Sequence, residues 1–286
     1  MTGHTCRMRY VSNAGLVLET EAEAIGIDLF SRDPAGLYPD TPPGLCEELL
    51  EEIGRGKIRA LIFTHEHGDH FCREKVWEAL GRRPGLPVLS TKPVIQTLEY
   101  NGRERQNWSI LAGSEGRQAD GKPGENNIYL ENGEKECRGL YPVPAAENGE
   151  PWWVQLGPFR IGFLYTAHEG AQYAEVANLT LLLEAAGRHF VVPGDAAASQ
   201  ELFARIRAWS PTIDWFFLPF PYVGLRSSRR MLAEALEIRR AFVLHQPRPE
   251  ADTQNWVKQA KMVCSRSQDG LPKPVFPEKL GEWYEL

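Results

Sequence analysis

Five short apolar runs in this chain of 286 residues each end in a side chain that can bind a metal ion. The runs are rich in β-branched and aromatic residues, which is typical of buried strands. The side chains at or just beyond their ends are Asp28, His65, His168, Asp195 and His245. If these strands share one sheet and one direction, their carboxyl ends lie at the edge where α/β sheets place their ligands. The sequence therefore predicts an α/β fold with one ligand-binding site.

Segments with helical spacing alternate with the apolar runs, which favours one central α/β core. We predict strands over 16–20, 24–30, 60–67, 159–168, 178–186, 189–195, 215–220 and 241–246. We predict helices over 43–54, 71–81, 92–100, 199–208, 227–239 and 253–264, and we expect Gly81 to end the second of them.

A polar, glycine-rich segment at about 101–150 interrupts this alternation and is too long for a simple connection. We interpret it as an insertion, with loops and a hairpin or two, in a single domain that spans 1–286. Trp152 and Trp153 follow it. These rings could anchor the insertion on the core or form a lid over a site, and the sequence favours the anchor.

Three of the seven histidines lie in the hexapeptide from His65 to His70. Imidazoles this close would repel one another when protonated, so a metal ion is the best reason for the cluster. Neutral imidazole suits zinc, manganese or iron, and a carboxylate supplies the charge that a second cation requires. We therefore expect two divalent metal ions, with Zn²⁺ first and Mn²⁺ or Fe²⁺ as alternatives. One ion would take His65, His67 and His168, the other would take Asp69, His70 and His245, and Asp195 would bridge them.

The segment THEHGDH reads as H-x-H-x-D-H and resembles the hallmark of the metallo-β-lactamase superfamily. The later segments TAH, PGD and LH follow in the order of that family's remaining metal ligands. The opening stretch MRYVSNAGLVLETEAEAIGIDLF resembles the first hairpin of the branch that contains the L-ascorbate 6-phosphate lactonases. The resemblance covers about 8–30, 58–80 and 155–250.

This resemblance implies an αββα four-layer sandwich, in which two mixed β-sheets are flanked by helices and a dinuclear site lies at one edge of the sheets. It also implies a catalytic role for Asp69, which would orient the nucleophile. We expect Asp28 to hold a ligating imidazole through its other ring nitrogen, or else to bind a neighbouring loop. By their positions in the family, Asn178 and Tyr222 are expected to contact substrate.

The function predicted from these features is metal-dependent hydrolysis by a metal-activated hydroxide. The resemblance implies a small, anionic ester, lactone or phosphodiester as substrate. One alternative is an iron-dependent oxidoreductase on the same fold. Another is a non-catalytic member that binds nucleic acid, although such members commonly lose ligands and all seven positions are filled here.

Composition narrows the class of partner. A formal charge of −6 and a pI near 5.7 argue against binding to nucleic acid or an anionic membrane through a general basic field. The N-terminal sequence has no signal-like apolar region and no window is apolar enough to span a membrane, so we expect a cytoplasmic protein without a membrane partner. The five scattered cysteines fit neither a disulfide framework nor a zinc ribbon.

One arginine-rich segment remains outside this assignment. The predicted helix over 227–239 and its flanks contain Arg226, Arg229, Arg230, Arg239 and Arg240. We interpret these as a solvated helix face, with contact to a phosphate or RNA as the alternative. The sequence makes no prediction of oligomeric state.

Overall fold

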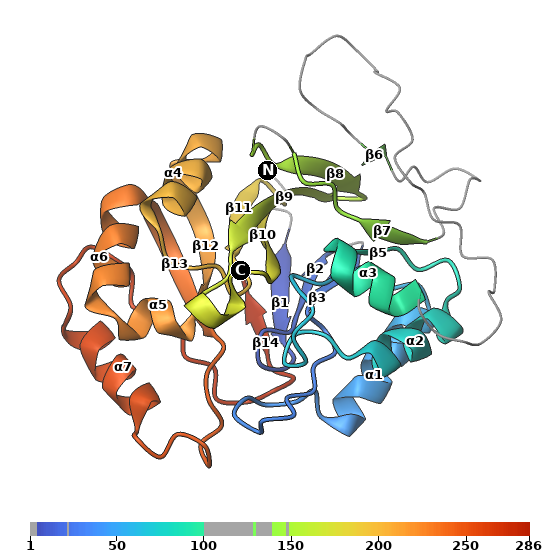
Figure 1. Cartoon of the computed structure of the whole chain (residues 1–286), viewed down its shortest axis with the longest axis horizontal. Coiled ribbons are helices and arrows are strands. Elements are labelled where there is room, and N and C mark those ends of the chain that lie inside the picture. The colour runs from blue at the N-terminus through green and yellow to red at the C-terminus, as the bar shows by residue number, and fades with distance from the viewer. Residues whose placement is uncertain (1–4, 22, 100–127, 130–138, 147–148) are drawn as a thin grey trace, which may run out of the picture.

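The computed structural model describes residues 5–21, 23–99, 128–129, 139–146 and 149–286. Within these ranges the chain forms two seven-stranded sheets that pack face to face, with helices on both outer faces (Figure 1). The first sheet has the strand order β14 (Trp283–Glu285), β1 (Cys6–Tyr10), β2 (Leu16–Thr20), β3 (Ala24–Ile27), β4 (Ile58–Ile62), β5 (Val88–Ser90) and β7 (Leu140–Pro142). The second has the order β13 (Glu237–Leu244), β12 (Thr212–Pro219), β11 (Arg188–Val192), β10 (Ala177–Ala185), β9 (Phe159–Ala167), β8 (Trp152–Leu156) and β6 (Ile128–Tyr129).

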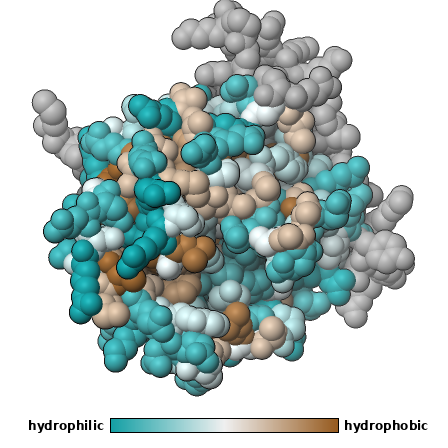
Figure 2. Space-filling view, turned by 60° about the vertical axis from the view of Figure 1, so that its left-hand side comes forward, coloured by the Kyte–Doolittle hydropathy of each residue, from teal (hydrophilic) through white to brown (hydrophobic). Residues whose placement is uncertain are grey.

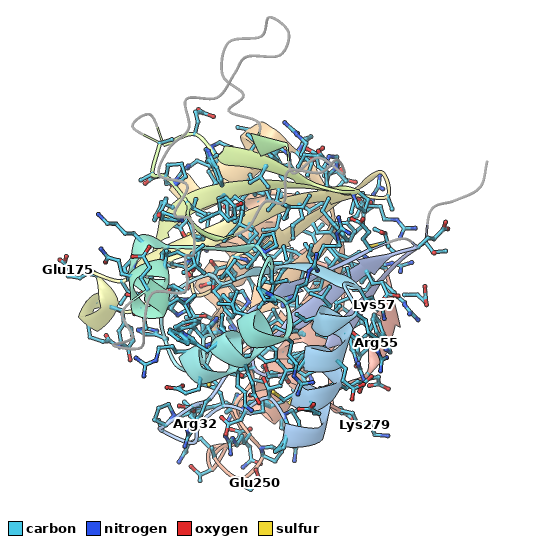
Figure 3. All side chains as sticks on the ribbon, turned by 90° about the vertical axis from the view of Figure 1, so that its right-hand side faces the viewer. Arg32, Arg55, Lys57, Glu175, Glu250 and Lys279 are labelled. Carbon is cyan, nitrogen blue, oxygen red and sulfur yellow. The ribbon has the colours of Figure 1, made fainter. Side chains whose placement is uncertain are left out.

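The helices divide between the two outer faces. The first sheet is covered by α1 (Pro43–Gly54), α2 (Arg73–Arg82) and α3 (Lys92–Glu99), which lie toward the viewer in Figure 3. The second sheet is covered by α4 (Gln200–Trp209), α5 (Phe220–Gly224), α6 (Arg226–Ala235) and α7 (Trp256–Arg266). This is the four-layer αββα sandwich that the resemblance implied. No helix in the described part of the chain combines the length and the apolar character that crossing a membrane requires.

Alternating side chains explain why the sheets are buried on both faces. In β10, Leu179, Leu181 and Leu183 point into the core between the sheets, while Leu182 packs under the helices of the second sheet. Successive side chains of a strand point to opposite faces, so a run that is apolar throughout needs a cover on each side. The two sheets meet through one face each, and the helices cover the other faces.

Both sheets are mixed, and in each the strands that lead to the site run in one direction. In the first sheet, β3 and β4 are parallel. In the second sheet, β11 is parallel to β12 and β12 to β13, and β9 runs the same way because it is separated from β11 by the antiparallel strand β10. We grouped the ligands on the condition that the five ligand-bearing strands share one sheet. This condition was wrong, since the predicted ligands come from two sheets whose strand ends meet.

Most predicted helix ends differ from the structure by one to four residues, and two of these differences have a clear cause in the sequence. The helix expected over 227–239 stops at Ala235, and β13 begins at Glu237, because Ile238 is buried between the exposed Glu237 and Arg239. That period of two belongs to a strand. The helix expected to stop at Gly81 continues through Arg82, and the extended Arg83 precedes Pro84, a residue that disfavours helical backbone before it.

The two tryptophans after the 101–150 segment lie in β8. Trp153 is 8% exposed, and its ring packs so closely on Gly162 that a Cβ on Gly162 would lie 2.8 Å from the ring. Trp152 packs on the core between the sheets. The pair therefore anchors this end of the segment, as the sequence favoured. Most of 101–150 lies outside the described residues, so its assignment as an insertion in a single domain stays a prediction.

Candidate metal centre

All seven predicted ligands lie where the strand ends of the two sheets meet. Four of them directly follow strands or their end turns: His65 after β4, His168 after β9, Asp195 after β11 and His245 after β13. The other three, His67, Asp69 and His70, belong to the loop between β4 and α2. The structure divides the seven side chains into two donor sets, and in each set the ligand atoms lie within 4.8 Å of one another.

The first donor set contains His65, His67, His168 and Asp195. The Nδ1 atom of His67 lies 3.0 Å from Nε2 of His65 and 3.2 Å from Nε2 of His168. Oδ2 of Asp195 lies 3.9 Å from His65 Nε2 and 3.6 Å from His168 Nε2. Three imidazole nitrogens and a carboxylate oxygen around one point form a donor set suited to a tetrahedral divalent ion.

The second donor set contains Asp69, His70, His245 and again Asp195. The Nε2 atom of His245 lies 3.0 Å from Asp69 Oδ2 and 3.1 Å from Asp195 Oδ2. The Nε2 atom of His70 lies 3.2 Å from the other oxygen of Asp195, Oδ1. Asp195 thus belongs to both sets, and the grouping is the one predicted from the sequence.

Asp28 lies behind the second set. Its Oδ2 is 2.9 Å from Nδ1 of His70, and its two oxygens also accept the Thr64 backbone N–H and hydroxyl at 2.8 and 2.7 Å. All three side chains are fully buried. Thr64 was not predicted from the sequence, although a threonine beside an imidazole cluster could have drawn attention to it.

Asn13 is a second residue that sequence reasoning missed. Its side-chain amide donates to Asp69 Oδ2 at 3.0 Å and to the Asp69 backbone carbonyl at 3.2 Å, and the Asn13 backbone carbonyl accepts the backbone N–H of His245 at 3.0 Å. Asn13 therefore joins the loop before β2 to two members of the second set. The signal was present, since Asn13 lies in the opening stretch MRYVSNAGLVLETEAEAIGIDLF, which carried part of the family resemblance.

Asn178 supports the turn that carries Asp195. Its amide donates to Thr166 Oγ1 and the Pro193 carbonyl at 2.8 and 2.9 Å, and its Oδ1 accepts the Asp195 N–H at 3.0 Å. The side chain is fully buried and lies outside the lining of the cleft over the metal centre. The structure thus gives Asn178 a positioning role, and its expected contact with substrate stays a prediction.

The histidine pKa values shift in opposite directions in the two donor sets. Burial alone would lower the pKa of His70 and of His245, but the carboxylates of Asp195 and Asp69 outweigh it, raising the pKa of His70 and bringing that of His245 to about 9. Burial and the neighbouring imidazoles lower the pKa values of His65 and His67. Burial opposes ionisation of Asp69 and Asp195, yet the adjacent His70 and His245 hold both carboxyl pKa values below the usual range.

The donor chemistry fits cations. Among the described residues, the buried Nε2 atoms of His70 and His245 have no hydrogen-bond partner of acceptable geometry, although both point at carboxylate oxygens. A buried polar atom without a partner is costly, and metal coordination removes that cost. Both donor sets therefore suit a divalent ion, and Asp28 has the contact expected of a residue that fixes a ligating imidazole.

A cleft of about 490 Å³ opens over the two donor sets. The ring of Tyr38 packs edge-on against His245, with centroids 4.0 Å apart, and the ring of Tyr173 lies 4.8 and 4.9 Å from those of His67 and His168. Tyr222 also lines the cleft, but its buried hydroxyl donates to the Ala196 carbonyl at 2.7 Å. Tyr38 thus lies against the second donor set and Tyr173 against the first. Neither of these two tyrosines was predicted from the sequence.

No protein-family model matches the chain, and no curated protein does. Solved structures resemble it over nearly its whole length. The metallo-β-lactamase fold protein YhfI from Bacillus subtilis has a TM-score of 0.59 at 14% identity, covering 99% of both chains. Igni18, a metallo hydrolase from the hyperthermophilic archaeon Ignicoccus hospitalis, has a TM-score of 0.56 at 14% identity, covering 99% of this chain and 98% of that one.

A third resemblance is to a redox enzyme. CmlA, a diiron β-hydroxylase from Streptomyces venezuelae, has a TM-score of 0.57 at 13% identity, covering 99% of this chain and 54% of that one. Identities this low are evidence of fold alone. The chain has the metallo-β-lactamase fold, as predicted, and its structural neighbours include a metallo hydrolase and a diiron hydroxylase.

Proposed function

We propose that this protein is a metal-dependent hydrolase that holds two divalent cations in the two donor sets. The observation that carries the proposal is the position of Asp195. Its Oδ1 lies 3.2 Å from His70 Nε2, and its Oδ2 lies between the sets, 3.1 Å from His245 Nε2, 3.6 Å from His168 Nε2 and 3.9 Å from His65 Nε2. A carboxylate shared between two histidine-rich sets suits two adjacent cations. Zn²⁺ is our first choice, and Mn²⁺ or Fe²⁺ also fits such donors.

Cations held there would make a hydroxide nucleophile available near neutral pH and would polarise the group under attack. The side chains of the protein would orient the nucleophile. Asp69 is held by the Asn13 amide at 3.0 Å and lies 3.0 Å from His245, so its carboxylate is fixed at the edge of the second set. In the proposal, Asp69 orients the nucleophile.

The proposed substrate is a small, anionic ester, lactone or phosphodiester. The cleft volume of about 490 Å³ suits a small molecule, and two cations would attract an anionic group. The aromatic rings of Tyr38, Tyr173 and Tyr222 would pack against its non-reacting part. A lactone of the type used by L-ascorbate 6-phosphate lactonases is one specific form of this proposal, suggested by the first hairpin and its Asn13.

The test is metal analysis by mass spectrometry on protein purified without chelators or added metal. It is paired with hydrolysis of bis(p-nitrophenyl) phosphate and of a simple lactone, before and after chelation. We expect about two equivalents of metal, with turnover that chelation abolishes and added metal restores. Unchanged rates in metal-free protein would refute the proposal.

The likeness to a diiron β-hydroxylase favours one alternative, an iron-dependent oxidoreductase. The same experiment separates the two functions. Iron in the purified protein, together with oxygen consumption and no hydrolysis, would move the assignment to the alternative.

A further inference from the structure

A second cavity, of about 420 Å³, lies between α6 and α7 and shares no lining residue with the metal cleft. Four arginines line it: Arg226, Arg229, Arg230 and Arg266. From the sequence we placed Arg226, Arg229 and Arg230 on one predicted helix and its flanks together with Arg239 and Arg240. In the structure the last two lie on β13. Without those two, the arginines of α6 occupy positions i, i+3 and i+4, which share one helix face.

Arg229 forms the fixed base of this cavity. Its side chain is 3% exposed, and Nε and Nη2 donate to the Asp269 carboxylate at 2.8 and 3.0 Å, while Nη1 lies 3.1 Å from Cys264 Sγ. A paired and hydrogen-bonded arginine of this kind is held in one geometry. Among the described residues that line the cavity, Asp269 is the one acid, and its carboxylate is already paired with Arg229.

The other three arginines keep most of their charge uncompensated. Arg230 approaches Glu234 to 4.0 Å, but both side chains are mostly exposed, at 76% and 69%, so the pair contributes little. In the described part of the chain, Arg226 and Arg266 make no ion pair. Like charges at i and i+4, as in Arg226 and Arg230, destabilise a helix. This local excess of positive charge stands in a chain whose net charge is −6.

The start of α6 adds to the positive field. The helix begins at Arg226 without a side-chain cap and without an acid in its first turn. Helix N-termini attract anions through their free N–H groups. Beside the arginines, the half-exposed Met262 and Val263 of α7 give the cavity an apolar part. Figure 2, in which this side of the molecule comes forward, shows hydrophilic side chains with a few hydrophobic ones between them.

We propose that the α6–α7 cavity binds a small phosphorylated organic molecule, with Arg226, Arg230 and Arg266 holding its phosphate. The guanidinium group matches phosphate oxygens in charge and geometry. Met262 and Val263 would contact the organic part. A hollow between two helices suits a small molecule better than a nucleic acid, whose backbone needs an extended basic surface. The proposal is independent of hydrolysis at the metal centre.

The probe is 1-naphthyl phosphate, titrated calorimetrically into the full-length protein alongside inorganic phosphate and 1-naphthol. Phosphate is also expected to bind at the metals, so the titrations are repeated in Asp195→Ala, which removes the shared ligand. We expect saturable binding of 1-naphthyl phosphate in both proteins, tighter than that of inorganic phosphate, and no binding of 1-naphthol. In the Asp195→Ala background, where only the cavity should bind phosphate, Arg226→Ala combined with Arg266→Ala should weaken the binding by about tenfold or more.

The control is Arg55→Ala combined with Lys279→Ala, which removes the same charge from side chains that project outward elsewhere (Figure 3). It should change the affinity by less than about twofold. Circular dichroism checks that each variant is folded. Binding that is absent in Asp195→Ala, or that survives loss of the two arginines in that background, would refute the proposal. Equal affinity for inorganic phosphate would reassign the cavity to free phosphate, and selective loss of RNA binding in the arginine variant would reassign it to nucleic acid.

Discussion

The Asp28 carboxylate and the His70 ring are joined by a hydrogen bond of 2.9 Å, and neither side chain is exposed to solvent. The same carboxylate accepts two hydrogen bonds from Thr64, so both of its oxygens are used. The bond fixes the ring so that its other nitrogen, Nε2, faces Asp195 at 3.2 Å. Asp28 itself has a positive φ of 45°, a conformation that residues other than glycine adopt at some cost.

The first prediction concerns this carboxylate. Asp28→Asn removes the charge that holds the His70 ring, and substitutions behind a metal ligand commonly cost 10–100-fold in affinity. We therefore expect the metal of the second donor set to bind about 10–100-fold more weakly, with less effect on the first. Competition against a coloured chelator measures the metal affinity of each donor set. Asp214→Asn is the control, because Asp214 is a partly buried aspartate that pairs with Arg239, outside both donor sets. Equal loss in the two variants would contradict the prediction.

The ligands could be predicted because each carries its own chemistry and follows an apolar run. Strand ends of like direction meet in space, so His65, Asp195 and His245 could be grouped before their distances were known. The residues that hold these ligands in place could not be predicted in this way. Asn13 and Thr64 are small polar residues of a kind found in many loops, and their roles arise from backbone that distant segments bring together.

Some of the strands missed in the sequence are very short. The strands β5 and β14 contain three residues each, too few to show a period of two. The contact of Tyr38 with His245 depends on the loop 33–40, where the Asp33 carboxylate accepts the N–H groups of Ala35, Leu37 and Tyr38. The sequence of this loop is compatible with such a turn, but it does not determine the direction of the Tyr38 side chain.

The second prediction separates the donor sets by counting metals. Asp195 belongs to both sets and His168 to the first alone. His168→Ala should therefore leave about one equivalent of metal in the second set, whereas Asp195→Ala should leave much less than one equivalent in total. Both variants should lose turnover by at least about a thousandfold, since hydrolysis requires both ions in the proposal. Metal content after gel filtration distinguishes them, and two retained metals in His168→Ala would exclude its role as a ligand.

The third prediction concerns pH in metal-free protein. Despite burial, the charge of Asp195 raises the pKa of His245 to about 9, whereas a histidine in an unfolded chain titrates near 6.5. The folded state therefore holds this proton more tightly. The stabilisation that it gives is complete below pH 6.5 and is lost as the pH rises through about 9.

Thermal unfolding of wild type and His245→Gln, both chelated, tests this between about pH 6 and pH 9.5. The difference in melting temperature should be largest at the acidic end of this range and should shrink toward the alkaline end. His189→Gln, a substitution outside both donor sets, corrects for general effects of pH. A difference that stays constant would contradict the linkage. Because a metal ion takes the neutral imidazole, metal binding at about pH 7 should also release this proton, which calorimetry in buffers of different ionisation enthalpy can detect.

The last prediction concerns the turn that delivers Asp195. Gly194 has a φ of 59°, and a Cβ there would lie 2.5 Å from Asn178 Oδ1 and 2.8 Å from Thr64 Cβ. Neither neighbour can give way easily, because Asn178 and Thr64 are buried and hydrogen-bonded. Gly194→Ala should thus destabilise the fold by about 2–4 kcal/mol, from backbone strain and overpacking together. It should also weaken metal binding, since the Asp195 N–H is held by Asn178.

Gly187→Ala provides the matched comparison, because Gly187 also has a positive φ, of 71°, but a Cβ at this position would meet no described atom within 4 Å. Its cost should be about 1–2 kcal/mol, from the left-handed backbone alone. Denaturant unfolding of the two metal-free variants gives the difference directly, and metal titration shows whether Gly194→Ala alone affects the centre. Equal destabilisation, with normal metal binding in both, would mean that the turn tolerates a side chain and that Asp195 is positioned by other contacts.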